Sequence, residues 1–158
     1  MRNWLVLAVV IVVIDQITKY YIVQHFALHE TLYVTPFFNV VHVRNTGAAF
    51  SMLADAGGWQ RIFFIGVAVV ASVWVVWLLR RHPQQKLFCL ALALILGGAI
   101  GNLIDRLWLG SVVDFVQVHY AGWYFPAFNV ADSAITIGAG LLIWDGLRPQ
   151  RDVVADKT

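Results

Sequence analysis

Four long apolar segments, separated by shorter polar stretches, dominate the pattern of the chain. They cover residues 4–23, 62–79, 87–104 and about 128–144. Each has about 17 to 20 residues, which is the length that a helix needs to cross roughly 30 Å of hydrocarbon. The first contains Asp15 and Lys19 and has no small-residue cleavage site, so we interpret it as a retained helix and not a signal peptide. The pattern predicts one integral membrane domain with four transmembrane helices.

Composition supports this class of protein. Hydrophobic residues make up 60% of the 158 residues, charged residues only 13%, and the mean hydropathy is +0.73. Soluble domains carry about 25% charged residues. The formal net charge is +2, and no basic stripe of the kind that binds nucleic acid is present, so we expect no nucleic-acid partner. The single cysteine, Cys89, excludes an intramolecular disulfide and any multi-cysteine metal site.

The basic residues are unevenly distributed over the connections between the apolar segments. Seven lie near the chain ends or between the second and third segments: Arg2, Arg80, Arg81, Lys86, Arg148, Arg151 and Lys157. The other two connections hold three: Arg44, Arg61 and Arg106. Because cytoplasmic connections carry the excess of Lys and Arg, we expect both termini in the cytoplasm. Residues 24–60 and 105–127 then face outward, and residues 149–158 form a polar tail.

The two outward connections have sequences typical of strands. Residues 32–43 are rich in β-branched and aromatic side chains and run into a turn-like sequence at 45–47. Residues 112–118 are predicted to form a second extended piece. The aromatic residues at 123–125 suit the headgroup level of a membrane, where amphipathic rings concentrate. The sequence thus predicts a short sheet on the outward side.

Polar residues inside or beside the apolar segments gather at the outward end of the predicted bundle. An ionisable group inside a membrane is a functional candidate because burying it is unfavourable. Asp15 lies roughly 16 Å along the first helix with Lys19 one turn further out, and the other groups flank the outward ends of the third and fourth helices. The set comprises Asp15, Lys19, Asn102, Asp105, Arg106, Asp114, Asn129 and Asp132. The inward half of the predicted bundle has no comparable set.

These groups also have structural interpretations. Asp15 and Lys19 stand four residues apart with the acid first, which favours a helical ion pair. Asn129 followed by Asp132 is typical of a capped helix N-terminus. Asp114 has the sequence context of a solvated loop aspartate. A structural role therefore competes with chemistry at each of these positions.

Two other patterns favour structure over chemistry. The glycines within residues 97–101 permit close packing of helices. His25, His29 and Glu30 have a helical spacing that a metal could use, but they do not form the H-E-x-x-H pattern. We therefore expect no metal site. Cys89 lies near the inward start of the third helix, away from the polar set, and is expected to be an inert buried thiol.

Asp114 and Asp132 are the strongest candidates for catalytic residues. They lie 18 residues apart, on opposite sides of an outward connection. Two carboxylates held close together cannot both ionise readily, so they share a proton, and such a pair can activate water and protonate a leaving amine. The sequence therefore predicts an aspartic protease. Two other classes stay open: a small proton-coupled transporter or channel subunit that uses Asp15, Lys19 and Asp132 as a relay, and a non-enzymatic membrane scaffold.

Five segments, in this order, resemble the type II signal peptidases, the lipoprotein signal peptidases of bacteria. They are DQITK at 15–19, RNTGAAFS at 44–51, GGAIGNLIDR at 97–106, VVDF at 112–115 and FNVADS at 128–133. Their order and spacing match over essentially the whole chain apart from the tail. No functional position departs from the family pattern.

The resemblance implies an aspartic endopeptidase that removes the signal peptide from diacylglyceryl-modified prolipoproteins. It implies a cut immediately before the lipidated cysteine. By the same resemblance Asp114 and Asp132 form the catalytic pair, and Asn102 and Asn129 orient that pair and the substrate backbone. The residues implied to support the site or contact substrate are Asp15, Lys19, Asn45, Gly47 and Arg106.

The resemblance also implies the surroundings of the site. The family uses no metal or organic cofactor and is inhibited by cyclic peptides such as globomycin. Its fold adds a small extracytoplasmic β-cradle on the membrane surface and a short outer interfacial element that can cover the site. Residues 29–55 and 107–126 are the matching candidates. We accordingly expect a monomer in the bacterial inner membrane, in contact with membrane lipids and with its active site near the extracytoplasmic face.

Overall fold

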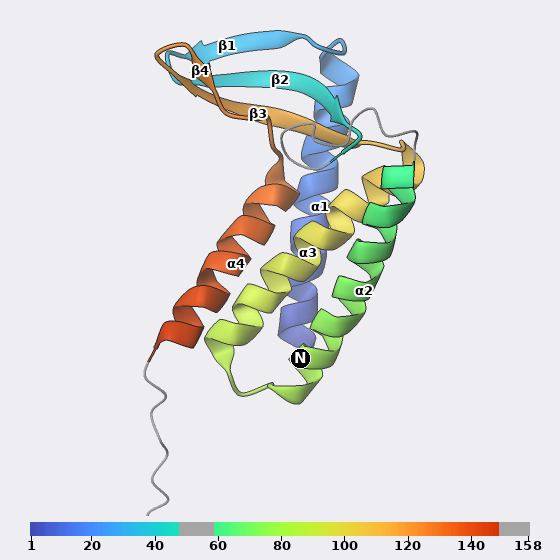
Figure 1. The fold of residues 1–158 in the computed structure, drawn as a ribbon, viewed down its shortest axis with the longest axis vertical. Coiled ribbons are helices and arrows are strands. Elements are labelled where there is room, and N and C mark those ends of the chain that lie inside the picture. Colours follow the sequence, from blue (N-terminus) through green and yellow to red (C-terminus); the bar gives the residue numbers. More distant parts are fainter. Residues whose placement is uncertain (48–58, 149–158) are drawn as a thin grey trace, which may run out of the picture.

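The computed structural model describes residues 1–47 and 59–148. Four helices form a bundle, and a small sheet lies over one end of it (Figure 1). The helices are α1 (Arg2–His25), α2 (Trp59–Arg81), α3 (Lys86–Trp108) and α4 (Val130–Leu147). Each is long and apolar enough to cross a membrane, as the hydropathy pattern predicts.

The helix bounds differ from the predicted spans near the sheet. The third helix runs to Trp108, four residues further than predicted, because backbone hydrogen bonding continues after the side chains become polar. The fourth helix begins at Val130, two residues later than predicted, because Asn129 caps it. The predicted tail at 149–158 and the part of the predicted outer segment at 48–55 lie outside the described residues.

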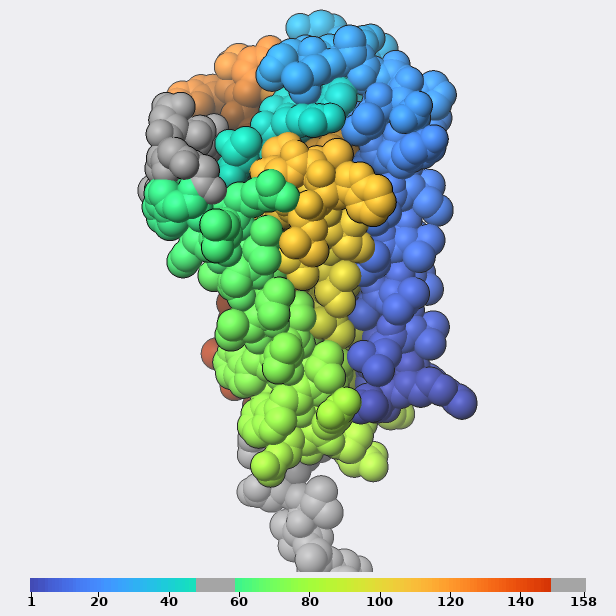
Figure 2. Space-filling view, turned by 90° about the vertical axis from the view of Figure 1, so that its right-hand side faces the viewer, coloured from blue at the N-terminus to red at the C-terminus, as the bar shows by residue number. Residues whose placement is uncertain are grey.

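Small residues let α3 pack closely against its neighbours. A Cβ atom on Gly97 would lie 2.9 Å from the backbone oxygen of Ala8 in α1. A Cβ atom on Gly138 of α4 would lie 2.7 Å from the backbone oxygen of Ala91. Helices in lipid gain little from hydrophobic burial, so close backbone approach contributes much of their association. The glycines of α3 thus have the packing role that the sequence predicts. In the space-filling view, the part of α3 nearest the sheet fills the space between α1 and α2 (Figure 2).

The half of the bundle away from the sheet has an apolar core. Its members are Ala8, Val75, Leu79, Cys89, Leu92 and Leu96. Cys89 is fully buried there, and its thiol donates to the backbone oxygen of His82 over 3.1 Å. The N-terminus, the α2–α3 connection and the end of α4 all lie at this end of the bundle (Figure 1). We call it the basic end, because Arg2, Arg80, Arg81, Lys86 and Arg148 lie there.

The sheet has four antiparallel strands in chain order. They are β1 (Thr31–Thr35), β2 (Phe38–Asn45), β3 (Val112–Tyr120) and β4 (Trp123–Tyr124). The two predicted extended regions are confirmed as β1–β2 and β3, and β4 adds a hairpin whose turn residues Ala121 and Gly122 both have positive φ. The pairing of Asn45 with Val112 places the end of β2 beside the start of β3. This pairing brings two predicted site segments together.

Candidate active site

The predicted polar residues meet where the sheet joins the bundle. Asp114 is the third residue of β3, and Asp132 lies in the first turn of α4. Both line a cavity of about 520 Å³. The other predicted site residues on its wall are Asn45, Gly47, Asn102 and Arg106. The fold therefore gathers groups from β2, α3, β3 and α4 around one space.

The start of α4 holds Asp132 in place. Asn129 is the N-cap, and its Oδ1 accepts a hydrogen bond from the backbone N–H of Asp132 over 2.9 Å. Asp132 Oδ2 accepts from the backbone N–H of Asn129 over 3.3 Å, which completes a capping box. The predicted cap is thus confirmed. It leaves Asp132 Oδ1 available to Asn102, whose Nδ2 donates to it over 2.7 Å.

Asn129 also links Asp132 to Asp114. Because the backbone N–H of Asp132 can only donate, the Asn129 amide must turn its oxygen to that group and present its Nδ2 elsewhere. That Nδ2 donates to Asp114 Oδ1 over 2.7 Å. The other carboxyl oxygen of Asp114 accepts from Asn45 Nδ2 over 3.2 Å. One fully buried asparagine therefore fixes the relative positions of both carboxyl groups.

Lys19 is the cation of the network, although only 3% of its side chain is exposed. Its Nζ pairs with Asp15 Oδ2 over 2.9 Å, which confirms the predicted ion pair, and with Asp105 Oδ2 over 3.0 Å. It also donates to Asn102 Oδ1 over 2.9 Å. Because an ammonium group has no acceptor, this bond fixes the Asn102 amide with its Nδ2 toward Asp132. Lys19 thus acts on Asp132 through Asn102.

Asp105 and Gln16 complete the network. Asp105 belongs to the polar set that the sequence places at the outward end, but neither residue is among those that the resemblance implies for the site. Asp105 Oδ2 accepts from the backbone N–H of Val113, the residue before Asp114, over 3.0 Å. Gln16 Nε2 donates to Asp105 Oδ1 over 3.0 Å and to the backbone oxygen of Gly101 over 3.1 Å. The sequence signals Asp105 through its charge at the outward end of the third helix, whereas Gln16 is signalled only by its position between Asp15 and Lys19.

Asp15 and Arg106 connect the site to the helices around it. Asp15 Oδ1 accepts from the backbone N–H of Ala131 over 2.9 Å, which ties α1 to the start of α4. Arg106 Nη1 donates to the backbone oxygen of Asn102 over 3.4 Å. The Arg106 guanidinium also lies 5.0 Å from the ring centre of Phe64 in α2, a cation–π arrangement. Arg106 thus lines the cavity, and its guanidinium packs against an aromatic ring of α2.

The surroundings of Asp114 favour its protonated form. Asn45 Oδ1 accepts from the backbone N–H of Gly47 over 3.0 Å, so the predicted turn is present and leaves Asn45 Nδ2 for Asp114. Asp114 is 2% exposed. Burial, and next the charge of Asp132, raise the pKa of Asp114 to about 7, against the lowering effect of the donors Asn45 and Asn129. Asp114 therefore keeps a proton up to near-neutral pH.

Comparison with known proteins assigns the family. The model of the signal peptidase (SPase) II family matches residues 7–148. The chain belongs to this family. It is an aspartic-type signal peptidase, a hydrolase that processes lipoproteins.

Named relatives of this signal peptidase II match it over nearly the full chain. A lipoprotein signal peptidase of Ralstonia nicotianae is 59% identical over 148 residues, which is 94% of this chain and 86% of that protein. The lipoprotein signal peptidase of Paraburkholderia phymatum is 55% identical over 148 residues, which is 94% of this chain and 89% of that protein.

Solved structures agree with the fold. A bacterial membrane enzyme solved at 2.3 Å resolution has a TM-score of 0.86 and 32% identity to this chain, covering 100% of this chain and 95% of that one. A second, solved at 1.9 Å resolution, has a TM-score of 0.82 and 34% identity and covers 94% of each chain. Four apolar helices of membrane-spanning length and a small antiparallel sheet mark this signal peptidase II as a multi-pass membrane protein.

The helical spacing considered for a metal does not exist in this signal peptidase II. The helix α1 ends at His25, and His29 has a left-handed φ of 70°. Glu30 Oε2 instead accepts from the backbone N–H of Ala27 over 2.7 Å. Among the described residues, no group of three or more His, Cys, Asp or Glu side chains is arranged to hold a metal ion.

Proposed function

We propose that this signal peptidase II hydrolyses the peptide bond before a diacylglyceryl-modified cysteine, with Asp114 and Asp132 as its catalytic pair. The observation that carries the proposal is that both carboxyl groups line one cavity of about 520 Å³ and are joined by Asn129. Two carboxyl groups so placed hold one proton between them. This is the state that an aspartic protease needs.

Asp114 supplies the acid and Asp132 the base. The raised pKa of Asp114, about 7, keeps its proton in place. The two carboxyl oxygens of Asp132 instead accept hydrogen bonds from Asn102 Nδ2 and from the backbone N–H of Asn129. Asp132 takes a proton from water as the water oxygen bonds to the scissile carbonyl carbon, and Asp114 gives its proton to the carbonyl oxygen. The intermediate then collapses. The C–N bond breaks, the proton on Asp132 passes to the leaving amine, and Asp114 recovers a proton from the hydroxyl that becomes the new carboxyl group.

The cavity suits a substrate that remains anchored in lipid. Phe125, Phe128 and Ile137 provide apolar wall beside the carboxyl groups. Binding the diacylglyceryl group away from the reacting bond helps to position that bond. We therefore expect kcat/KM to fall sharply when the lipopeptide lacks its diacylglyceryl group, and equal turnover of both peptides would exclude this role. Globomycin-like cyclic peptides would compete for the same cavity of the monomeric enzyme.

We also place the sheet and the site at the extracytoplasmic face of the bacterial inner membrane, with both termini in the cytoplasm. The charge distribution supports this placement, because Arg80, Arg81 and Lys86 lie at the basic end. Aromatic side chains support it too, since Trp108 and Trp123 are 87% and 84% exposed at the sheet end.

Cysteine labelling tests the placement. In a Cys89→Ala background, Trp123→Cys should react with a membrane-impermeant maleimide in intact spheroplasts. Arg81→Cys should react only after lysis. The reversed pattern would invert the orientation.

The decisive experiment follows cleavage of a synthetic diacylglyceryl-cysteine lipopeptide by the purified full chain in detergent. Asp114→Asn and Asp132→Asn should each lower kcat by about 10³-fold with unchanged circular dichroism. The amide oxygen at position 132 can still cap α4. Asp145→Asn, near the end of α4 away from the site, is the matched control and should turn over like the wild type. Mass spectrometry should find the lipidated cysteine at the new N-terminus. Undiminished cleavage by either folded site variant would remove that residue from the mechanism.

The transporter and scaffold alternatives have less support. A proton relay needs polar groups through the full thickness of a bundle. In the described part of the chain, the buried charged residues Asp15, Lys19, Asp105 and Asp114 gather at the sheet end, and the core near the basic end is apolar. The family assignment identifies a hydrolase.

A further inference from the structure

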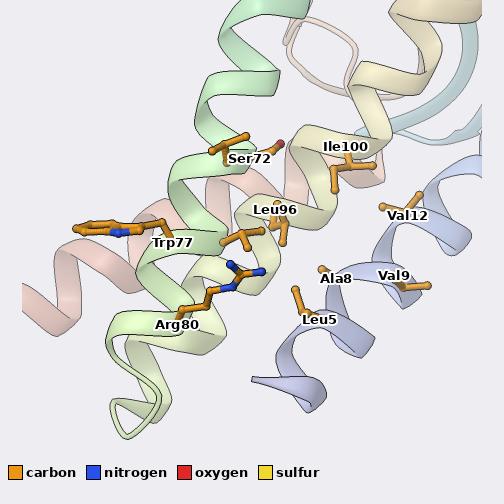
Figure 3. A pocket seen from close by; sticks show the side chains of 11 residues that line it. Leu5, Ala8, Val9, Val12, Ser72, Trp77, Arg80, Leu96 and Ile100 are labelled. Carbon is orange, nitrogen blue, oxygen red and sulfur yellow. The ribbon is translucent and has the colours of Figure 1, made fainter.

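A second cavity lies in the half of the bundle away from the sheet. It occupies about 790 Å³ between α1 and α2, with α3 behind it (Figure 3). Its walls are almost entirely apolar and include Leu5, Val9, Val12, Val73, Leu96 and Ile100. We call this space the α1–α2 groove. It shares no lining residue with the catalytic cavity.

One charged side chain reaches the α1–α2 groove. Arg80, in the last turn of α2, turns its guanidinium toward the space between α2 and α1 (Figure 3). Within the described residues, no carboxylate pairs with it. The next residue, Arg81, instead lies over the ring of Trp77, 5.2 Å from the ring centre. The groove therefore has a cationic mouth at the basic end, and this cation has no counter-charge among the described residues.

We propose that the α1–α2 groove binds an anionic phospholipid, with the phosphate on Arg80 and an acyl chain along the apolar walls. The lining residues extend over 5–12 in α1 and 72–80 in α2, roughly 10 and 12 Å of helix. The groove thus runs from a cationic mouth toward the middle of the bundle, as a lipid runs from its headgroup into a leaflet. A guanidinium binds phosphate through two parallel hydrogen bonds. On the proposed orientation, this lipid belongs to the cytoplasmic leaflet.

Charge complementarity favours this occupant over other apolar ones. A signal-peptide helix begins with a basic region, which would meet Arg80 and its basic neighbours and be repelled. A second copy of the chain packed in the same orientation would bring an identical basic end to the same depth. A zwitterionic lipid carries its own cation beside the phosphate. An anionic lipid leaves its negative charge free to compensate Arg80.

Competition between two lipids tests the proposal. The purified full chain would be mixed in detergent with equal amounts of phosphatidylglycerol and phosphatidylcholine that have the same acyl chains, and retained lipid would be counted by native mass spectrometry. Wild type should retain phosphatidylglycerol in preference. Arg80→Gln should lower this preference roughly fivefold. Arg81→Gln removes the same charge at the same helix end and should change the preference less than twofold.

Filling the groove supplies a second, independent variant. Val9→Trp should reduce the amount of retained phosphatidylglycerol, whereas Val13→Trp, on the same helix but outside the groove, should not. If Val9→Trp fails to fold, Val73→Trp fills the groove from the opposite wall. None of these positions belongs to the proposed catalytic machinery, so lipopeptide cleavage reports correct folding separately from lipid binding.

The alternatives give distinct results. Equal loss of preference in Arg80→Gln and Arg81→Gln would show a general surface potential and overturn the proposal. Undiminished lipid in a folded Val9→Trp variant would exclude the groove. A dimer in detergent that Val9→Trp abolishes would assign the groove to a second copy. If the catalytic proposal is wrong, only the cleavage assay will show it. The lipid-binding measurement does not depend on cleavage and can still be interpreted.

Discussion

The two ends of the bundle are held together by different kinds of contact. At the sheet end, Lys19, Asn102 and Asn129 are buried, and each makes several directed hydrogen bonds or ion pairs. At the basic end, the core is apolar and the helices approach through glycines such as Gly138. Directed bonds fix the orientation of a side chain, whereas apolar packing fixes mainly distance. The same four helices thus fix the orientation of polar side chains at the sheet end and pack closely against one another through apolar contacts at the basic end.

Removing the charge of Lys19 should have the largest effect on stability and activity. Lys19→Met leaves Asp15 and Asp105 as buried carboxylates without their counter-charge. We expect the free energy of unfolding to fall by about 3–5 kcal/mol and cleavage to be lost. Thermal unfolding in detergent measures the first and the lipopeptide assay the second. Lys19→Arg keeps the charge and should lose less. Wild-type stability in Lys19→Met would show that the ion pairs contribute nothing net.

Asn102→Leu should test whether Asn102 orients the carboxyl group of Asp132 for catalysis. It removes the Nδ2 donor to Asp132, so kcat should fall about 10²-fold while KM changes little. Steady-state kinetics on the lipopeptide measure both constants. Leu92→Met, in the apolar core, is the comparison and should leave both constants unchanged. A rise in KM alone would show that Asn102 binds substrate and does not position Asp132.

Raising the pH above neutrality should lower the activity of the catalytic pair reversibly. Above about pH 7, Asp114 loses the proton that the proposed acid step needs, so kcat/KM should fall about tenfold per pH unit. The folded state binds this proton more tightly than the unfolded chain, whose carboxyl has the ordinary pKa of 3.8. The Asp114 contribution to stability therefore decreases from about pH 4 to about pH 7 and is level above that. A pH–rate profile and unfolding in Asp114→Asn, which should lack this slope, measure the two effects.

Two glycines of α4 test the packing at the other end with the smallest expected effects. A Cβ on Gly138 meets the backbone of α3, so Gly138→Ala should lower the free energy of unfolding by about 1–3 kcal/mol. Turnover per folded molecule should not change. Gly140 faces open space, and Gly140→Ala should be neutral or stabilise the helix by about 0.5–1 kcal/mol. Loss of kcat in folded Gly138→Ala would show that the two ends are coupled.

Much of the fold follows from local sequence patterns. The apolar run length predicts the four helices, and the spacing of Asp15 and Lys19 predicts their ion pair. The order of Asn129 and Asp132 predicts the cap, although the predicted span starts two residues early because it counts the apolar Phe128, which precedes the cap residue. These features depend on residues a few positions apart, which is the range over which periodicity carries information.

The rest of the site depends on contacts between distant segments. The bond between Asp105 and the Val113 backbone, and the bonds of Gln16, require the registers of α1, α3 and β3 to be known. Nothing in local spacing sets these registers. The spacing of His25 and His29 is the opposite case, because a separation of four positions would place them on one helix face only if α1 did not end at His25.

The capping box of α4 has a consequence for drug resistance. Asp132 and Asn129 begin the helix, and the proposed chemistry uses the same two side chains. A substitution that removes the side-chain acceptor at either position would therefore damage the fold and the reaction together, and Asp132→Asn, which keeps an acceptor for the cap, would still lose the reaction. An inhibitor that bonds to these two groups would leave the bacterium few routes of escape. One that relies on the apolar wall at Phe125 or Ile137 would meet resistant variants sooner, because substitutions there leave the capping box intact.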